Sequence, residues 1–391
     1  MQLSRRVERI RESATLRVTR RALELRQQGV PVIDFGAGEP DFDSPAVAVE
    51  AAREALARGF TRYTANNGIP ELREALAERY RAAFGAPWQA ADVLVTVGGK
   101  GALFEASLAL FEEGTEVVLH TPAWVSFVEQ IQFAGARAVE VPTSGDDGFT
   151  IHAEPIVAAL GERTRAVILN SPCNPTGGVI EPAERRRVVE ACTERGIVVL
   201  SDETYERFAY DGFEPGSAAS LAAEFPQTVA VVGSFSKTYA MTGWRLGYLL
   251  GPRELVDAAA RIQSHATSNA TSFAMKGAVA ALQGAEPEVE AMIAEYAARR
   301  DLLLGRLARL PGIACRSPRG AFYAFPDVSE RLGDELPTPT AFAERLLEEE
   351  AVAVVAGEAF GSDRHMRLSF ACSRAHLSEG LDRIERFLAR H

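Results

Sequence analysis

Short runs of apolar and β-branched residues alternate along the chain with segments in which apolar positions recur at a helical spacing. The apolar runs stand at 93–97, 116–119, 166–169, 197–200, 229–232 and 248–250, and the helical segments include 102–111, 184–195 and 255–263. Strands that are apolar throughout are typical of a sheet covered on both faces, and their alternation with helices is typical of parallel connections. The pattern therefore predicts an α/β domain with a mainly parallel central sheet.

The pattern changes at about residue 286. A long charged helix is predicted over 286–310, followed by a strand at 321–325, a helix at 341–350, strands at 352–355 and 366–370, and a closing helix. This order predicts a second, smaller α+β domain of about 100 residues. We expect the chain to divide into an N-terminal arm with part of the small domain (1–44), a large domain (45–285) and a small C-terminal domain (286–391).

Polar residues and glycines follow directly after most of the predicted strands. These segments are Gly98-Gly99-Lys100, Thr121-Pro122-Ala123-Trp124, Asn170-Ser171-Pro172, Ser201-Asp202 and Gly233-Ser234. In open α/β sheets the ligand binds outside the carboxyl ends of the strands. We therefore expect these segments to converge on one site.

Composition and charge narrow the classes of function. The 391 residues are 47% hydrophobic, and the net charge of -11 argues against nonspecific binding of nucleic acid. The first 28 residues carry eight arginines against three glutamates, which we interpret as a solvated helix face or an oligomer arm. No run of 18 apolar residues and no targeting pattern occurs, so we expect no membrane span. Four cysteines without a C-x-x-C pair predict a reducing cytoplasm, no disulfide framework and no metal site.

Lysine is rare in this chain. Only Lys100, Lys237 and Lys276 occur, against 39 arginines. Codon bias accounts for this ratio, but an amine that must become neutral and nucleophilic is a position where arginine does not substitute, because guanidinium keeps its charge in proteins. A Walker loop, a dinucleotide fingerprint, a G-x-S-x-G elbow and an H-E-x-x-H motif are all absent. A lysine site remains as the candidate.

The segment from Ser234 to Tyr248, S-F-S-K-T-Y-A-M-T-G-W-R-L-G-Y, combines hydroxyls, an amine and a guanidinium after a predicted strand. It resembles the cofactor-lysine motif of the class I aminotransferases, which are fold type I enzymes dependent on pyridoxal 5'-phosphate. Further matching motifs are G-A-G-E-P-D-F from position 36, S-P-C-N-P-T-G from 171, S-D-E-T-Y from 201 and R-L-S-F from 367. The resemblance spans nearly the whole chain and implies a seven-stranded, mainly parallel sheet between helices plus a small α+β domain.

The resemblance implies three catalytic residues, Lys237, Asp202 and Tyr205. Lys237 is expected to form a Schiff base with the cofactor aldehyde and then to move a proton between the substrate Cα and the cofactor. Asp202 is expected to keep the pyridinium nitrogen protonated. Tyr205 and Asn174 would hydrogen-bond the phenolate oxygen and so lower the pKa of the Schiff base, with Trp124 stacked on the ring.

The resemblance also implies a phosphate site and a second subunit. Ser234, Arg245 and the backbone N–H groups at the start of the predicted helix are expected to bind the phosphate. The helix-start residues in this group are Gly99, Lys100 and Gly101. Tyr63 resembles the tyrosine that reaches the phosphate of the neighbouring subunit, which implies a homodimer with shared active sites whose N-terminal arm wraps the partner.

Residues for the substrate are expected from the same source. Arg367 would clamp the α-carboxylate with two hydrogen bonds, Gly38 would let the backbone approach it, and Trp124 and Asn174 would contact the substrate. A subgroup of bacterial aspartate aminotransferases carries G-G-K and an S-A-T run, which Lys100 and Thr15 match here. These two residues are expected to hydrogen-bond a distal carboxylate.

The expected activity is transfer of an amino group between an L-amino acid, with aspartate or glutamate favoured, and a 2-oxo acid such as 2-oxoglutarate. If Lys100 only neutralises the phosphate region, aromatic or broad specificity stays open. A carbon-sulfur β-lyase would share every cofactor contact. A regulatory module without catalysis is disfavoured by the presence of both Lys237 and Asp202.

Overall fold

A seven-stranded sheet forms the centre of the computed structural model, which describes residues 3–4, 7, 10 and 14–391. The strand order is β2-β8-β7-β6-β5-β3-β4. Their bounds are β2 (Val93–Val97), β3 (Glu116–Thr121), β4 (Arg137–Pro142), β5 (Thr164–Asn170), β6 (Val198–Asp202), β7 (Val229–Ser234) and β8 (Leu246–Leu250). Only β8 is antiparallel to its neighbours, so the predicted mainly parallel sheet is confirmed.

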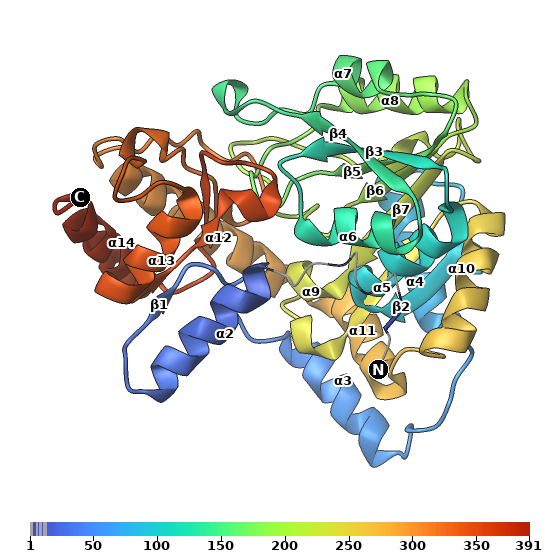
Figure 1. The fold of residues 1–391 in the computed structure, drawn as a ribbon. Helices are drawn as coiled ribbons and strands as arrows, with labels where there is room; N and C mark the ends of the chain where they lie inside the picture. The colour runs from blue at the N-terminus through green and yellow to red at the C-terminus, as the bar shows by residue number, and fades with distance from the viewer. Residues whose placement is uncertain (1–2, 5–6, 8–9, 11–13) are drawn as a thin grey trace.

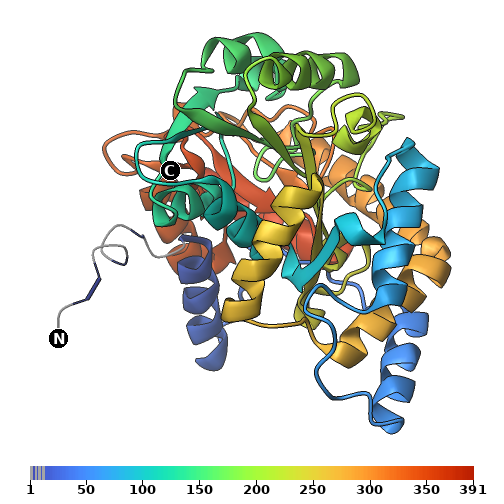
Figure 2. The ribbon, with the colours of Figure 1, turned by 90° about the vertical axis from the view of Figure 1, so that its right-hand side faces the viewer.

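Helices cover both faces of this sheet (Figure 1 and Figure 2). Along β5, Val167 and Leu169 pack on one helical layer, whereas Ala166 and Ile168 pack on the other. The first layer contains α3 (Ala46–Ala57), α4 (Pro70–Phe84), α7 (Ala153–Ala158), α8 (Pro182–Thr193) and α11 (Ser272–Gly284), and the second contains α5 (Gly98–Leu110), α6 (Val125–Phe133) and α10 (Arg253–Ala266). Because successive side chains point to opposite faces, burial on both sides explains why these strands are apolar throughout. No helix in the described part of the chain is both long and apolar enough to cross a membrane.

A second hydrophobic core is formed mainly by the C-terminal elements, which lie on the left in Figure 1. Its helices are α12 (Glu286–Leu307), α13 (Pro339–Glu350) and α14 (Arg374–Leu388), and its strands are β9 (Tyr323–Ala324), β11 (Val355–Ala356) and β12 (Met366–Ser369), in the order β11-β12-β9. From the N-terminal part of the chain, β1 (Ile33–Asp34) pairs in parallel with β10 (Val352–Ala353), and α2 (Ala14–Gln27) packs beside it. Ile33 and Phe35 belong to this second core. The division at residues 44 and 285 stays a prediction.

The structure differs from the sequence-based expectation at the short strands. The single strand expected over 352–355 is wrong, because β10 pairs with β1 whereas β11 pairs with β12 in another sheet. The strand expected over 321–325 is reduced to two residues, Tyr323 and Ala324. β4 was not among the predicted apolar runs, since it is an edge strand in which only Val141 is buried. Edge strands need no apolar face on both sides.

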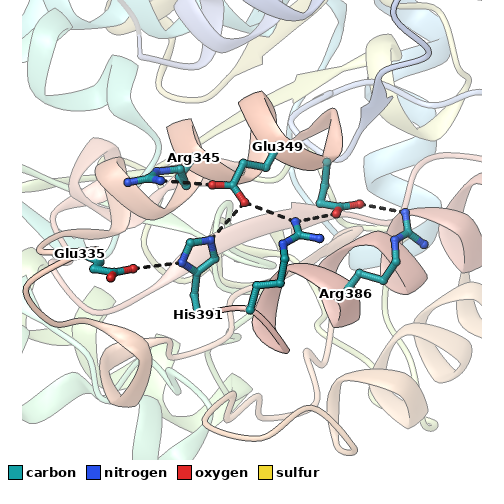
Figure 3. A network of polar contacts seen from close by, with 7 residues as sticks. Glu335, Arg345, Glu349, Arg386 and His391 are labelled. Atoms are coloured by element: carbon teal, nitrogen blue, oxygen red, sulfur yellow. Dashed lines mark hydrogen bonds and ion pairs between the residues drawn. The ribbon is translucent and has the colours of Figure 1, made fainter.

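A polar network ties the end of α13 to the end of α14 (Figure 3). Arg386 and Arg390 each donate to the carboxylate of Glu350, at 2.8 and 2.7 Å. His391 lies 3.1 Å from the carboxylate of Glu349, which also accepts from Arg345 at 3.2 Å. Basic groups in the last turn of α14 and in the residues that follow it thus bond acidic groups in the last turn of α13, and these bonds hold the ends of the two helices together.

Candidate active site

A cavity of about 770 Å³ lies where the carboxyl ends of the large-sheet strands face the smaller core. Eleven of the predicted site residues line it: Gly38, Gly99, Lys100, Trp124, Asn174, Asp202, Tyr205, Ser234, Lys237, Arg245 and Arg367. The segments that follow β2, β3, β5, β6 and β7 therefore converge as expected for an open α/β sheet. A larger cavity of about 1120 Å³ lies between α2, α6 and α13, and among the described residues none of the predicted site residues lines it.

Lys237 lies in the one-turn helix α9 (Phe235–Thr238), directly after β7. Its Nζ donates a hydrogen bond to the backbone carbonyl of Gly38. Burial lowers the pKa of Lys237 to about 8, Glu39 opposes this shift, and nearby cations, of which Arg367 is the first, add to it. A larger share of this amine is neutral at pH 7 than for a free lysine, which is what a nucleophilic amine requires.

Asp202 ends β6 and is 4% exposed. One carboxylate oxygen accepts from the backbone N–H of Thr204 at 3.0 Å, and within the described chain no arginine or lysine forms an ion pair with it. Burial raises the pKa of Asp202 to about 6. A buried carboxylate without a cation partner, facing a cavity, suits a ligand that presents a protonated nitrogen. The pyridine ring of pyridoxal phosphate is such a ligand.

Asn170, at the end of β5, was not predicted as a site residue. Its side-chain nitrogen donates to the backbone carbonyl of Asp202 at 3.2 Å, and its side-chain oxygen accepts from the backbone N–H of Asn174 at 3.0 Å. Its own backbone N–H donates to Nε2 of His120 at 3.1 Å. Asn170 thus joins two segments that line the cavity. Its signal in the sequence was its place as the first polar residue after an apolar run.

The start of α5 forms a cradle with two side chains from the segment after β7. A Cβ on Gly98 would lie 2.5 Å from Nη2 of Arg245, and a Cβ on Gly99 would lie 3.2 Å from Cβ of Ser234. Glycine at these positions therefore lets a guanidinium and a hydroxyl approach the unbonded N–H groups of the first helical turn. This donor set fits a phosphate. Gly101 lies in the same turn but faces β2 and does not line the cavity.

Arg367 lies on β12 and is 2% exposed. Its Nη1 donates to the side-chain oxygen of Asn174 at 3.0 Å, and its Nη2 donates to the carbonyl of Gly36 at 2.7 Å. The guanidinium stacks 4.5 Å from the ring centroid of Tyr323, whose hydroxyl lies 2.8 Å from that of Tyr205. Nε has no hydrogen-bond partner in the described structure. A buried guanidinium with an unused donor suits a carboxylate ligand.

Tyr323 was missed by the sequence reasoning because nothing distinguishes it from the other apolar residues of the predicted strand at 321–325.

Lys100 faces the cavity, with its Nζ 4.8 Å from the ring centroid of Trp124. Burial, with a contribution from Arg245, lowers the pKa of Lys100. Tyr63 is 91% exposed and does not line the cavity. Ser13 and the side chain of Thr15 lie outside the described residues.

Comparisons with known proteins agree over the full length. The family model "Aminotransferase class I and II" matches residues 30–384. The chain is 43% identical to the probable aspartate/prephenate aminotransferase of Aquifex aeolicus (99% of this chain, 98% of that protein) and 39% identical to the aspartate aminotransferase of Geobacillus stearothermophilus (99% of each). Its fold matches the structure of the aspartate aminotransferase from Thermus thermophilus with maleate, with a TM-score of 0.94, 42% identity and 99% coverage of both chains. The resemblance seen in the motifs is confirmed.

Proposed function

Since this chain belongs to the class I and II aminotransferase family, we propose that it transfers the amino group of aspartate or glutamate to a 2-oxo acid such as 2-oxoglutarate, with pyridoxal 5'-phosphate as cofactor. The observation that carries the proposal is the amine of Lys237, with its lowered pKa, in a cavity that also holds an unpaired buried carboxylate, a phosphate-type cradle and a buried guanidinium. The bound cofactor supplies an aldehyde for amines and a ring that withdraws electrons from the substrate Cα. A carbon-sulfur β-lyase and a module without catalysis are less consistent with the named relatives.

Lys237 would hold the cofactor through its amine and, with that amine free, would act as the base that moves a proton at the substrate Cα. Its lowered pKa supports both roles, because a neutral amine is the base and the nucleophile. Asp202 holds a proton on the ring nitrogen through a charge-assisted hydrogen bond. Asn170 supports this geometry by fixing the backbone of Asp202.

The ring oxygen, the ring face and the phosphate of the cofactor are bound by residues from separate segments. Tyr205 and Asn174 donate to the ring oxygen, and Trp124 covers the ring. Ser234 and Arg245 bind the phosphate, together with the N–H groups of the first turn of α5, for which Gly99, Lys100 and Gly101 were predicted. The missing side chains of Gly98 and Gly99 support this assignment, since a Cβ there would fill the cradle.

The substrate is bound by groups on the opposite side of the cavity. Arg367 binds the α-carboxylate with its guanidinium, and Gly38 allows the backbone to approach the same carboxylate. Lys100 and Thr15 bind a distal carboxylate, which favours aspartate and glutamate. The position of the Lys100 ammonium in the cavity wall supports this part of the proposal.

The proposal includes a homodimer in which Tyr63 contacts the phosphate in the neighbouring subunit. Tyr63 is 91% exposed, and Val47, Val49 and Leu56 of α3 expose 40%, 41% and 46% of their surface, which is unusual for large apolar side chains near one another in sequence. Sedimentation tests this: an active monomer of 42.2 kDa would contradict it. In a dimer with shared sites, mixing Lys237→Ala and Tyr63→Ala subunits restores activity, because one site of each hybrid keeps both wild-type residues.

We also propose that the enzyme works in a reducing cytoplasm and divides into an N-terminal arm with part of the small domain (1–44), a large domain (45–285) and a small C-terminal domain (286–391). The division is supported by the separate hydrophobic cores and by the pairing of β1 with β10. Expression of 45–285 alone should give a protein that keeps the sheet but loses the Arg367 clamp.

The decisive experiment mixes the purified protein with single amino acids and follows the absorbance of the cofactor. Conversion to the amine form by aspartate or glutamate, with release of the 2-oxo acid, supports transamination. Pyruvate and ammonia released together would favour the β-lyase, and no spectral change would favour a module without catalysis. Borohydride should attach the cofactor covalently to wild type and to Lys276→Ala, but not to Lys237→Ala.

A further inference from the structure

Tyr323 lies between Arg367, the proposed carboxylate clamp, and Tyr205, a proposed cofactor-binding residue. It comes from β9, where it pairs with Ser369 of β12, two residues after Arg367. Its hydroxyl lies 2.8 Å from the hydroxyl of Tyr205, and the guanidinium of Arg367 lies 4.5 Å from its ring centroid. Tyr323 is fully buried and Tyr205 is 5% exposed. One side chain thus contacts the carboxylate clamp on one side and a cofactor-binding residue on the other.

The hydrogen-bond capacity of the two hydroxyls sets their direction. A tyrosine hydroxyl has one proton to donate. If Tyr205 gives its proton to the cofactor ring oxygen, as we propose, its own oxygen accepts a bond from Tyr323. Within the described chain, the Tyr323 hydroxyl has no other hydrogen-bond partner. The bound cofactor therefore fixes a chain of two bonds that runs from Tyr323 through Tyr205 to the ring oxygen.

We propose that Tyr323 is a positioning residue that transmits the charge of Arg367 to the cofactor ring oxygen through Tyr205. The inference rests on the proposed function, because it requires the cofactor and the α-carboxylate to occupy the sites assigned above. No sequence motif pointed to Tyr323, and the role follows from its two contacts.

The physical basis is polarisation of the hydrogen-bond chain. A cation near the ring makes the Tyr323 hydroxyl a stronger donor, and a bond accepted by Tyr205 strengthens the bond that Tyr205 donates, most of all where water is excluded. Burial raises the pKa of Tyr323, and the positive charge of Arg367 opposes that rise. A substrate carboxylate on Arg367 cancels part of its charge, so the chain weakens when substrate binds.

The cofactor bound to Lys237 reports the strength of this chain. Donors to the ring oxygen favour the deprotonated form of the bound cofactor and lower the pH midpoint of its absorbance change. Asp202 on β6 is a charged group close to Tyr205. Lys237 on α9 and Asp34 on β1 are charged groups close to Arg367. These groups remain in a Tyr323→Phe variant, which removes only one hydroxyl.

The test is a pH titration of cofactor absorbance in the holoenzyme, wild type and Tyr323→Phe, without and with saturating succinate, a dicarboxylate that has no amine. We expect Tyr323→Phe to raise the midpoint of the free holoenzyme by about 0.5 to 1 pH unit, the size of one hydrogen bond. Succinate should raise the midpoint of wild type, and this rise should be smaller in Tyr323→Phe. The phenylalanine ring keeps the contact with Arg367, so packing changes little.

Two comparisons separate this role from a general loss of packing. Tyr80→Phe is a matched control, because Tyr80 is also fully buried and its hydroxyl pairs with that of Tyr248 at 3.3 Å, away from the cavity lining. It should leave the midpoint unchanged. In a Tyr205→Phe background, Tyr323→Phe should have no further effect on the midpoint, because the chain is already broken.

A wild-type midpoint in Tyr323→Phe overturns the inference, as does an equal shift in Tyr80→Phe or an additive shift in the double variant. These results leave the proposed function intact if the wild-type cofactor band titrates and responds to aspartate. If the wild-type protein shows no such band, the proposed function itself fails. The two failures are therefore distinguishable.

Discussion

Replacing Lys100 by methionine removes an ammonium from the cavity wall and keeps an unbranched side chain. In the structure this ammonium lies 4.8 Å from the ring centroid of Trp124. The backbone carbonyl of Lys100 accepts a hydrogen bond from the side chain of Gln130 at 3.3 Å. The backbone of Lys100 is thus held within α5, and the substitution changes the charge without removing a helix contact. If Lys100 binds the distal carboxylate, Lys100→Met should reduce activity with aspartate far more than activity with phenylalanine.

The magnitude follows from two opposing contributions. A hydrogen bond to a charged group contributes about 1.5 to 3 kcal/mol. Turning toward the substrate weakens the contact with Trp124, and a cation over an aromatic ring at an accessible site contributes about 0.5 to 1 kcal/mol. The difference is about 1 to 2 kcal/mol, which corresponds to a roughly 5- to 30-fold fall in the aspartate-to-phenylalanine ratio of kcat/KM.

Lys276→Met is the matched control for this measurement. Lys276 forms an ion pair with Glu71 at 2.7 Å and lies 5.1 Å from the ring centroid of Phe60, so it resembles Lys100 in charge and in aromatic contact. It does not line the cavity. The control variant should keep the wild-type ratio, because loss of one positive charge elsewhere in the chain does not discriminate between substrates.

The assay compares kcat/KM for aspartate and phenylalanine with the same 2-oxo acid in all three proteins. An unchanged ratio in Lys100→Met would refute the reasoning. If kcat/KM falls equally with both amino acids, Lys100 supports the cofactor in the phosphate region and not the choice of substrate.

Three further predictions concern other ionisable groups. Asp202→Asn should keep the borohydride-reducible link to Lys237 but lower kcat by about 100-fold or more, since a preorganised charge is lost; wild-type turnover would contradict it. In the cofactor-free protein, acylation of Lys237 should follow a pH midpoint of about 8, and a midpoint near the ordinary lysine value would contradict burial as the cause. Burial alone would raise the pKa of Glu350, but Arg390 and Arg386 hold this pKa below its ordinary value. Glu350→Gln should therefore lower Tm at pH 7, and this loss of Tm should shrink as the pH falls below about 4.3. A loss of Tm that does not depend on pH would exclude the ion pairs of Figure 3.

The sheet was predictable from the sequence because its strands are buried on both faces. Apolar runs such as 166–169, alternating with helical segments, are typical of covered parallel strands, and the polar residue after each run marks the cavity edge. β4 lacked this signal, since an edge strand carries exposed charges. The strands β10 and β11 were predicted as one, because the break at Val354 depends on partners that lie hundreds of residues away at β1 and nearby at β12.

Site residues were predictable where a motif or a strand end placed them, and not where tertiary packing did. Lys237 and Asn174 follow strands of the large sheet and Asp202 ends one, so their convergence is a property of the topology. Tyr323 reaches the cavity only because β9 pairs with β12 and the smaller core packs against Tyr205. No local pattern encodes that contact, and inspection of 321–325 alone gives an ordinary apolar strand.

The charge of the cavity differs in sign from the charge of the chain, and this links the site to its ligands. Five cationic side chains line the cavity against three carboxylates: Arg26, Lys100, Lys237, Arg245 and Arg367, with Asp34, Glu39 and Asp202. In a chain of net charge -11, a local excess of cations is unfavourable by itself, because like charges repel in a site with little water. A phosphate, an α-carboxylate and a distal carboxylate would each neutralise one of the cationic side chains. Binding of the first anion therefore lowers the net positive charge of the cavity and weakens its attraction for the next anion. Arg245, Arg367 and Lys100 would each face one anionic group of a phosphorylated cofactor and a dicarboxylic amino acid, whereas a neutral amino acid would leave the ammonium of Lys100 without an anionic partner.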